Sequence, residues 1–289
     1  MIKRKDMLGL IDATAEEISE ILDTAANMKK LLKQGIKKLP HLEGCTATIL
    51  FYENSTRTRT SFELAAKYMG ASTINIAASS SSVAKGETLI DTGKTLDAMK
   101  NDFIIIRHPM GGAPYLLAKT VKASVLNAGD GMNEHPTQAL LDMCTMRERF
   151  GKIEGLKVAI LGDIKHSRVA KSDLFGLTKL GAEVKMFAPE TLIPKGIDRL
   201  GAKLCASREE AVEGADVVMG LRIQLERQQA GNFPSLNEYA EFYGVNEKVL
   251  SLASPDAIVM HPGPVNRGVE LTSAVIDDGK SRIEDQVLS

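Results

Sequence analysis

The chain has 289 residues, of which 44% are hydrophobic, so it is long enough to bury the cores of two domains. Its 36 lysines and arginines nearly balance 37 aspartates and glutamates, and a net charge of -1 argues against a nucleic-acid or membrane-surface partner. No apolar run reaches the roughly 20 residues of a membrane span, and the first residues lack the apolar core of a signal peptide. These features predict a cytoplasmic protein.

The cysteines predict neither a disulfide framework nor a metal site. Cys45, Cys144 and Cys205 are odd in number, far apart and in no metal-ligand spacing. We expect each to be a small buried hydrophobic residue in a reducing compartment.

The first predicted element is a helix that starts at a capping box. Thr14 and Glu17 stand three residues apart, and apolar residues then recur at helical spacing until Gly35. We expect this helix to be part of the scaffold.

The stretch FYENSTRTRTSF joins a predicted strand over 45–52 to a predicted helix over 60–70. The hydroxyl and guanidinium groups at this junction belong to Ser55, Thr56, Arg57, Thr58 and Arg59. Helix-terminal N–H groups beside an arginine suit a phosphate or carboxylate better than a neutral ligand. The alternative is structural, with Ser55 as a helix cap followed by solvated arginines.

Strand and helix patterns alternate through the rest of the chain and restart after GKIEGLK. The expected strands lie over 72–77, 102–108, 123–129 and 158–164, and then at EVKMFAP, AKLCAS, DVVMGLR and AIVMHPG. Helices are expected over 87–100, about 135–150 and 167–180. This alternation predicts an α/β protein with two doubly wound parallel-sheet domains, 1–150 and 151–289, and the active site between them.

Polar residues follow several of these strands, where ligands of such sheets bind. Arg107 ends a very apolar strand, so it either reaches solvent or faces a ligand, and Lys85 lies in a serine-rich loop whose composition alone favours a solvated surface segment. His135 precedes Pro136 at a helix N-terminus, which favours a neutral imidazole that donates a hydrogen bond, although a lone histidine is often structural. Gln138 follows about one turn later and offers an amide.

The second half repeats this pattern with different groups. Arg168 lies near a helix start, Arg222 and Gln224 follow a strand, and Pro262 and Pro264 leave carbonyl oxygens available to a ligand. The single glycine of LGD and the GKT of GETLIDTGKT are too sparse to indicate a dinucleotide site or a P-loop.

Seven segments in this order resemble the catalytic chains of aspartate carbamoyltransferases, within the aspartate/ornithine transcarbamoylase family. They are FYENSTRTRTSF, SSVAKGET, IIIRHP, GDGMNEHPTQALLD, LGDIKHSRVAKS, LRIQLER and HPGPVNRGVE. Ornithine enzymes resemble one another in a His-Cys-Leu-Pro segment and a Ser-Met-Gly loop, where this chain has HPGP at 261–264 and LRIQ at 221–224. The cations Lys85, Arg168 and Arg222 also suit a dicarboxylate acceptor.

The resemblance implies transfer of the carbamoyl group of carbamoyl phosphate to L-aspartate in pyrimidine biosynthesis. It makes 1–150 the carbamoyl-phosphate-binding domain and 151–289 the aspartate-binding domain. The implied carbamoyl-phosphate ligands are Ser55, Thr56, Arg57, Thr58, Ser81, Arg107, His135, Gln138 and Pro262. The implied aspartate ligands are Lys85, Arg168, Arg222, Gln224 and Gly263. The implied catalytic residues are Arg57, Thr58, Lys85, Arg107 and His135.

Relatives insert the residues matching Ser81 and Lys85 into a neighbouring subunit, which implies a homotrimer with shared sites. A regulatory chain is a further candidate partner, and no metal or organic cofactor is implied. Relatives also continue into another apolar helix beyond SRIEDQVLS, whose absence would uncover part of the domain interface. The alternatives are a transcarbamoylase for another amine and a non-catalytic anion-binding partner.

Overall fold

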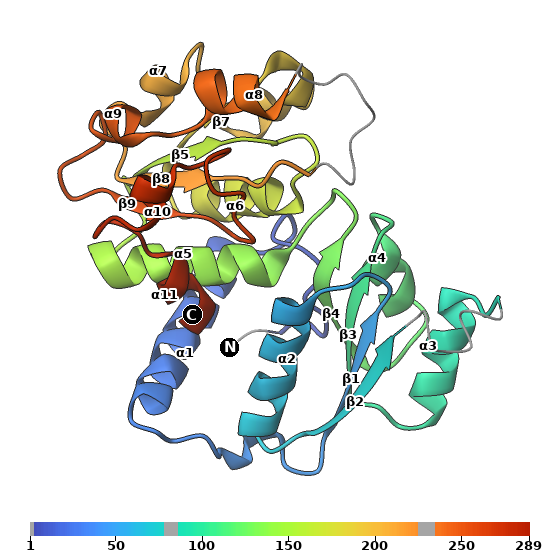
Figure 1. Ribbon diagram of the computed structural model, residues 1–289. Helices are drawn as coiled ribbons and strands as arrows, with labels where there is room; N and C mark the ends of the chain where they lie inside the picture. The colour runs from blue at the N-terminus through green and yellow to red at the C-terminus, as the bar shows by residue number, and fades with distance from the viewer. Residues whose placement is uncertain (1–2, 78–85, 225–234) are drawn as a thin grey trace. The chain divides into compact units, whose positions relative to one another are not determined.

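The computed structural model describes residues 3–77, 86–224 and 235–289 of the chain (Figure 1). The chain forms two compact units, each of which contains one sheet. Unit 1 consists of Met1–Asp12 and Asp23–Thr137, and unit 2 of Ala13–Leu22 and Gln138–Ser289. The domain boundary after residue 150 stays a prediction.

The sheet of unit 1 has four parallel strands in the order β2-β1-β3-β4. Its strands are β1 (Thr46–Phe51), β2 (Ser72–Ala77), β3 (Phe103–His108) and β4 (Ser124–Asp130). The helices up to the end of this sheet are α1 (Ala15–Lys33), η1 (Pro40–Leu42), α2 (Thr56–Tyr68), α3 (Leu89–Ala98) and α4 (Ala113–Ala118), and α5 (Pro136–Phe150) follows β4. After β2 the chain crosses to the other side of β1, so strand order reverses between β1 and β3.

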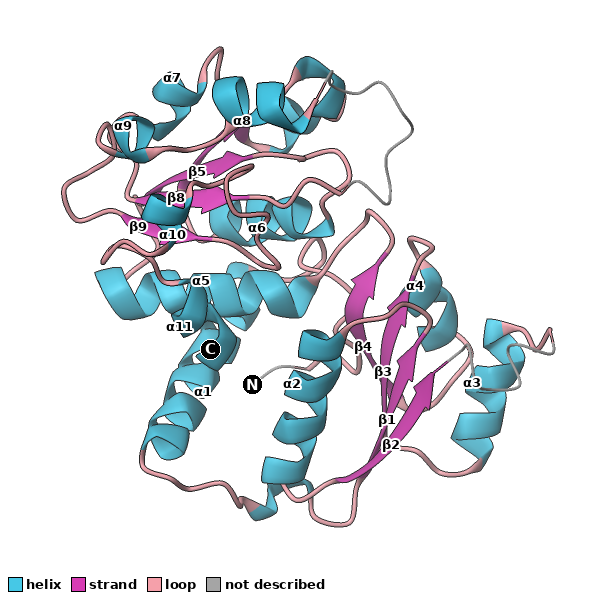
Figure 2. Cartoon of the chain, in the orientation of Figure 1, coloured by secondary structure: helices cyan, strands magenta, loops and turns pink. Residues whose placement is uncertain are grey.

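Side chains of the central strands alternate between two apolar layers, as expected for a sheet covered on both faces. Leu50 and Ile104 pack with Leu96 of α3 and Leu117 of α4. Ile49, Phe51 and Ile105 pack on the opposite face, with Ala66 of α2. Helix α2 lies on one side of this sheet, and α3 and α4 lie on the other (Figure 2). Unit 1 is therefore doubly wound.

The sheet of unit 2 has five parallel strands in the order β7-β6-β5-β8-β9. Its strands are β5 (Lys157–Leu161), β6 (Glu183–Phe187), β7 (Ala202–Leu204), β8 (Val217–Gly220) and β9 (Ile258–Met260). The helices are α6 (Arg168–Lys179), η4 (Glu190–Leu192), η5 (Ile197–Leu200), α7 (Arg208–Val212), α8 (Leu236–Tyr243), α9 (Glu247–Leu250), α10 (Ser273–Ile276) and α11 (Ile283–Leu288). Strand order reverses between β5 and β8.

One face of this sheet packs against α7, α9 and α10, which contribute Val212, Leu250 and Val275 to a single apolar cluster. Helix α6 covers the opposite face (Figure 2). The predicted pair of doubly wound parallel-sheet α/β domains is thus confirmed.

The local predictions hold with small shifts. Thr14 and Glu17 form the reciprocal capping box, with N–H to side-chain oxygen distances of 3.0 and 3.2 Å. The helix expected from residue 60 begins at Thr56, so Arg57 and Thr58 belong to its first turn. Cys144 and Cys205 are buried, but the expectation was wrong for Cys45, which is only partly buried. Among helices of the described residues, none is long and apolar enough to cross a membrane.

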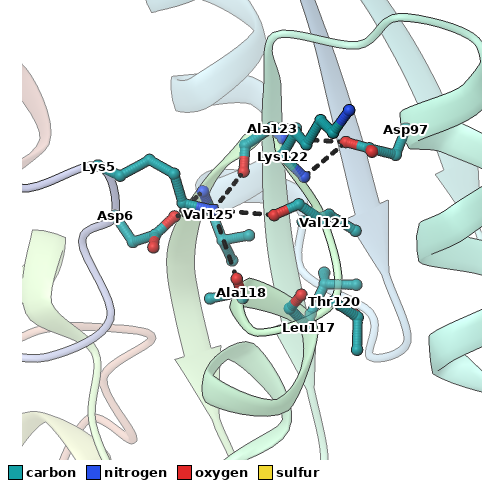
Figure 3. Close-up of polar contacts among 10 residues, drawn as sticks. All are labelled: Lys5, Asp6, Asp97, Leu117, Ala118, Thr120, Val121, Lys122, Ala123 and Val125. Carbon is teal, nitrogen blue, oxygen red and sulfur yellow. Dashed lines mark hydrogen bonds and ion pairs between the residues drawn. The ribbon is translucent and has the colours of Figure 1, made fainter.

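The start of the chain is fastened to unit 1 by a lysine. The Lys5 ammonium donates to the carbonyl oxygens of Val121 (3.0 Å), Ala123 (3.2 Å) and Ala118 (3.4 Å), at the end of α4 (Figure 3). It also lies 3.4 Å from the carboxylate of Asp6, which accepts the Val125 N–H. A cation at a helix C-terminus is favourable because the last carbonyl groups carry partial negative charge.

We expect Lys5→Met to lower the free energy of unfolding by about 1 kcal/mol, because it removes these charge-assisted hydrogen bonds while keeping the aliphatic stem. Urea unfolding of the two proteins measures the difference. Lys3→Met, at an exposed position nearby, serves as the control. Equal effects of both changes would contradict this role of Lys5.

Candidate functional site

The N-cap residue of α2, the helix after β1, makes no capping hydrogen bond through its side chain. Ser55 occupies the N-cap position of α2 with extended backbone angles (φ -159, ψ 104), but its hydroxyl makes no capping hydrogen bond. The first backbone hydrogen bond of the helix joins the Arg59 N–H to the Ser55 carbonyl at 3.3 Å. Ser55 is thus the N-cap residue by position, as the structural alternative expects, while its hydroxyl caps no backbone N–H of the helix.

Arg59 points back toward the strand rather than to this helix end. Its guanidinium lies 5.4 Å from the centroid of the Phe51 ring. This geometry is a cation–π contact that ties the first turn of α2 to β1. Arg59 is thus accounted for as a structural residue.

Arg107 and Thr58 are in direct contact, although Arg107 lies near the end of β3 and Thr58 lies in the helix that follows β1. The Arg107 Nη1 donates to the Thr58 hydroxyl at 3.2 Å and to the Ala128 carbonyl at 3.5 Å, while its Nε lies 3.3 Å from a carboxylate oxygen of Glu53. Strands β1 and β3 are paired, and the pairing of β3 with β4 shifts register between Ile106 and His108. Arg107 therefore stands at an irregularity of the sheet beside its switch point, where ligands of such folds bind.

The loop after β4, which precedes His135, is held by two fully buried carboxylates. Asp130 accepts the N–H of Gly112 at 2.7 Å and that of Glu134 at 3.1 Å. Glu134 accepts the N–H of Leu10 at 2.7 Å and that of Ile11 at 3.2 Å. His135, itself 7% exposed, thus follows a loop braced by charged hydrogen-bond acceptors.

A second imidazole lies beside this region. His108 ends β3, and its Nδ1 accepts the N–H of Met110 at 3.0 Å. Burial lowers the pKa of His108 below its ordinary value. Its ring centroid is 4.6 Å from that of Tyr52. We expect a neutral imidazole that packs against the end of β1.

In unit 2, the ends of β5 and β8 approach closely at Gly162. A Cβ on Gly162 would lie 2.6 Å from the Leu221 carbonyl oxygen, and its φ of +129 disfavours other residues. This glycine, too isolated to indicate a nucleotide site, is instead required for backbone packing at the switch point.

Asp163 then links the two strand ends. One carboxylate oxygen accepts the N–H of His166 at 3.1 Å and lies 2.8 Å from its Nδ1, and the other accepts the Gln224 N–H at 3.3 Å. Its side chain is fully buried. Asp163 thereby fixes the backbone that carries Gln224.

Glu270 braces the same segment from the HPGPVNRGVE stretch. Its carboxylate accepts the N–H groups of Ile223 (2.8 Å) and Asn266 (2.9 Å) and the Asn266 side-chain amide (2.7 Å). Burial raises the pKa of Glu270 despite these hydrogen bonds, which lower it. Arg222 therefore lies between two residues whose backbone N–H groups are both engaged. The Leu221 N–H donates to the Leu161 backbone carbonyl, and the Ile223 N–H donates to the Glu270 carboxylate.

Arg168 is the first residue of α6, and the Ser167 hydroxyl before it caps the helix by accepting the Ala170 N–H at 3.1 Å. Arg168 is only 3% exposed. Arg168 follows β5 and Arg222 follows β8, and these two strands are paired. The topology thus brings both predicted arginines to one edge of the sheet.

A chain of hydrogen bonds joins Gln138 to the turn after β9. The amides of Gln138 and Gln286 both donate to one oxygen of Asp142, at 3.0 and 2.6 Å. The Gln286 amide oxygen accepts the His261 N–H at 2.9 Å, and His261 Nδ1 accepts the Gly263 N–H at 2.8 Å. Burial raises the pKa of Asp142 to about 7, against the lowering effect of the two amides.

Most predicted site residues therefore fall at the carboxyl ends of strands. Direct contact joins Thr58 to Arg107, and the Asp142 chain joins Gln138 to Gly263. Ser81 and Lys85 lie outside the described residues.

Sequence reasoning missed the carboxylates Asp130, Glu134, Asp142, Asp163 and Glu270, and also Gln286. Each of them is an acidic or amide residue next to a strand end or at a buried helix position. Residues of these types are also common in exposed loops, so their presence in the sequence does not single them out. Within residues 3–77, 86–224 and 235–289, no group of acidic, histidine or cysteine residues is arranged to hold a metal ion.

Comparisons with known proteins agree over both units. The family model described as "Aspartate/ornithine carbamoyltransferase, carbamoyl-P binding domain" matches residues 5–148, and "Aspartate/ornithine carbamoyltransferase, Asp/Orn binding domain" matches 154–288. The aspartate carbamoyltransferase catalytic subunit of Ruminiclostridium cellulolyticum is 64% identical over 286 residues, which cover 99% of this chain and 91% of that protein.

Solved structures show the same fold. An ornithine carbamoyltransferase from Pyrococcus furiosus has a TM-score of 0.88 and 34% identity, covering 98% of this chain and 92% of that one. An aspartate transcarbamoylase from Trypanosoma cruzi, in complex with carbamoyl aspartate and phosphate, has a TM-score of 0.87 and 31% identity, covering 98% and 91%. Because both acceptor classes match equally in fold, the fold does not distinguish between the acceptors.

We expect Gly162→Ala to lower the free energy of unfolding by roughly 3 kcal/mol, because the new methyl group overlaps the Leu221 carbonyl and the backbone is unfavourable for alanine. Thermal and urea unfolding measure this loss. Gly214→Ala is the matched control, since Gly214 also has a positive φ (+64) but has nothing near its missing Cβ. Equal losses in the two variants would show that the close approach to Leu221 has no cost.

Proposed function

The chain belongs to the aspartate/ornithine carbamoyltransferase family, and from this premise we propose that it transfers the carbamoyl group of carbamoyl phosphate to L-aspartate. The products are N-carbamoyl-L-aspartate and phosphate. The observation that carries the choice of aspartate is the 64% identity, over 99% of this chain, to an aspartate carbamoyltransferase catalytic subunit. The cationic segment at 221–224 supports the same choice.

Unit 1 carries the groups for the phosphate and the carbamoyl oxygen. The start of α2 offers the hydroxyls of Ser55, Thr56 and Thr58, together with the Arg57 guanidinium and helix-terminal N–H groups. Helix N-termini and guanidinium groups favour a dianionic phosphate. We assign the phosphate of carbamoyl phosphate to residues 55–58.

The contact between Arg107 and Thr58 supports a role for both at the carbamoyl oxygen. The aspartate amine attacks the carbamoyl carbon, a C–N bond forms, the bond to the phosphate oxygen breaks, and the amine proton passes to the departing phosphate. Negative charge grows on the carbamoyl oxygen during attack, and Thr58, Arg107 and His135 stabilise it as hydrogen-bond donors. His135 acts in this scheme as a neutral polarising group and not as a base.

Unit 2 carries the groups for the carbamoyl amine and for the acceptor. Gln138 and the Pro262 carbonyl hold the carbamoyl NH2 group. Arg168 and Arg222, which follow paired strands, bind the two carboxylates of aspartate. The family resemblance adds the Gln224 side chain, which stands just after Arg222 in sequence, and the Gly263 backbone.

The electrostatics of this region argue against ornithine. The side-chain ammonium of ornithine would need an anionic partner, but the nearby carboxylates Asp163 and Glu270 already accept backbone N–H groups. An arginine at residue 222 would also repel the ammonium group.

The remaining parts of the proposal come from the family resemblance. We propose a cytoplasmic homotrimer in pyrimidine biosynthesis, in which Ser81 and Lys85 complete the site of a neighbouring subunit. Sedimentation equilibrium tests the trimer: a mass of three chains is expected, and a monomer with full activity would contradict shared sites.

The function is tested by supplying carbamoyl phosphate with L-aspartate or L-ornithine to the purified chain and measuring the carbamoylated product. Turnover with aspartate alone is expected. Turnover with ornithine alone would overturn the assignment of the acceptor, and turnover with neither would overturn the activity.

We expect His135→Ala to reduce kcat about 100-fold and leave the affinity for phosphate nearly unchanged, because it removes a donor to the developing oxyanion but no phosphate ligand. Initial rates and calorimetric titration with phosphate separate the two effects. The exposed His41 gives the control variant His41→Ala. An equal loss of turnover and phosphate affinity would contradict the role given to His135.

A further inference from the structure

We infer that Gln286 of α11 is a positioning residue, which orients both the Gln138 amide and the turn carrying Pro262 toward the carbamoyl amine. The inference rests on the proposed function, because it takes Gln138 and Pro262 as ligands of that group. Gln286 itself touches neither the substrate nor the reacting atoms.

One end of the Gln286 side-chain amide donates a hydrogen bond, and the other end accepts one. Its NH2 group donates to the Asp142 carboxylate at 2.6 Å, and its oxygen accepts the His261 N–H at 2.9 Å. The residue is 3% exposed, so water does not replace either partner readily. Glutamine donates at one end and accepts at the other at any pH, whereas a glutamate of the same length can donate only when it is protonated.

The first of these contacts reaches Gln138. Both amides donate to the same oxygen of Asp142, so the position of Gln286 sets where that carboxylate lies and hence which way the Gln138 amide points. When the Gln138 NH2 group is engaged by Asp142, the Gln138 oxygen is the end left to accept from a carbamoyl NH2 group.

The second contact reaches the turn after β9. The Gln286 oxygen fixes the His261 backbone, and the His261 ring fixes Gly263, so Pro262 is held on both sides. Within the described residues, the Pro262 carbonyl accepts no hydrogen bond that would compete with a ligand. A carbonyl held in this way can accept from the same NH2 group as Gln138.

Helix α11 is itself anchored beside this strand, which gives Gln286 a fixed base. The Arg282 N–H donates to the Val259 carbonyl at 2.8 Å, and the Val259 N–H donates to the Lys280 carbonyl at 2.9 Å. Gln286 lies one turn after Arg282 and donates its N–H to the Arg282 carbonyl at 3.0 Å. Helix α11 is therefore hydrogen-bonded to β9 through Arg282 and to α5 through Gln286.

The test is Gln286→Glu, which keeps size and shape but replaces the donating NH2 by an oxygen facing Asp142. At low pH one proton can be shared between the two carboxyl groups and restores the contact, whereas above their raised pKa values both ionise and repel. Among the described residues, Asp173 of α6 lies close enough to this pair that the Asp142 charge adds to burial in raising the pKa of Asp173. The His261 backbone N–H contacts Gln286, and the His261 imidazole accepts the Gly263 N–H.

We expect kcat/KM for carbamoyl phosphate in Gln286→Glu to stay within a few-fold of wild type near pH 5.5 and to fall by up to roughly 100-fold near pH 8.5. Gln286→Leu, which loses both contacts, should be impaired at every pH. The control is Glu284→Gln, which removes a carboxyl group at an exposed position of the same helix, whereas Gln286→Glu adds one. It should follow the wild-type pH profile. Circular dichroism at both pH values shows whether each variant is folded.

A folded Gln286→Glu variant whose pH profile matches that of Glu284→Gln would overturn the inference while leaving the proposed function intact. Absence of wild-type turnover with aspartate would instead overturn the proposed function, and the inference with it. If Gln286→Leu does not fold, the pH profile of Gln286→Glu still decides.

Discussion

The reversal of strand order in each sheet is the constraint on which the rest of the structure depends. In unit 1 it falls between β1 and β3, and in unit 2 between β5 and β8. The loops on either side of a reversal turn away from each other and leave the carboxyl ends of two paired strands uncovered. Thr58 and Arg107 meet at the first reversal, and Arg168 and Arg222 follow the two strands of the second.

Buried carboxylates keep these strand ends in place. Asp130 and Glu134 brace the loop before His135, and Asp163 and Glu270 brace the segment that carries Arg222. Burying a carboxylate is unfavourable unless backbone N–H groups and side-chain amides satisfy it, and each of these accepts at least two hydrogen bonds. These hydrogen bonds offset the cost of burial and hold the backbone in one arrangement before any substrate arrives, which is what stabilisation of a developing charge requires.

The sequence predicted the doubly wound sheets, the strand positions and the cationic residues at strand ends, because hydrophobic periodicity and strand-end chemistry are local signals. It did not predict that Gly162 packs against the Leu221 carbonyl or that Asp142 accepts from the Gln286 amide, since these partners are 59 and 144 residues apart in sequence. Helix α11 was missed because six residues carry too little periodicity to stand out.

In the proposed reaction, the switch point of the unit 1 sheet binds the phosphate, and that of the unit 2 sheet binds the carboxylates of the acceptor. The most direct measurement is a crystal structure of the chain with its proposed products, phosphate and N-carbamoyl-L-aspartate. We expect phosphate against residues 55–58 and the product carboxylates against Arg168 and Arg222. Phosphate bound elsewhere, or carboxylates that touch neither arginine, would contradict it.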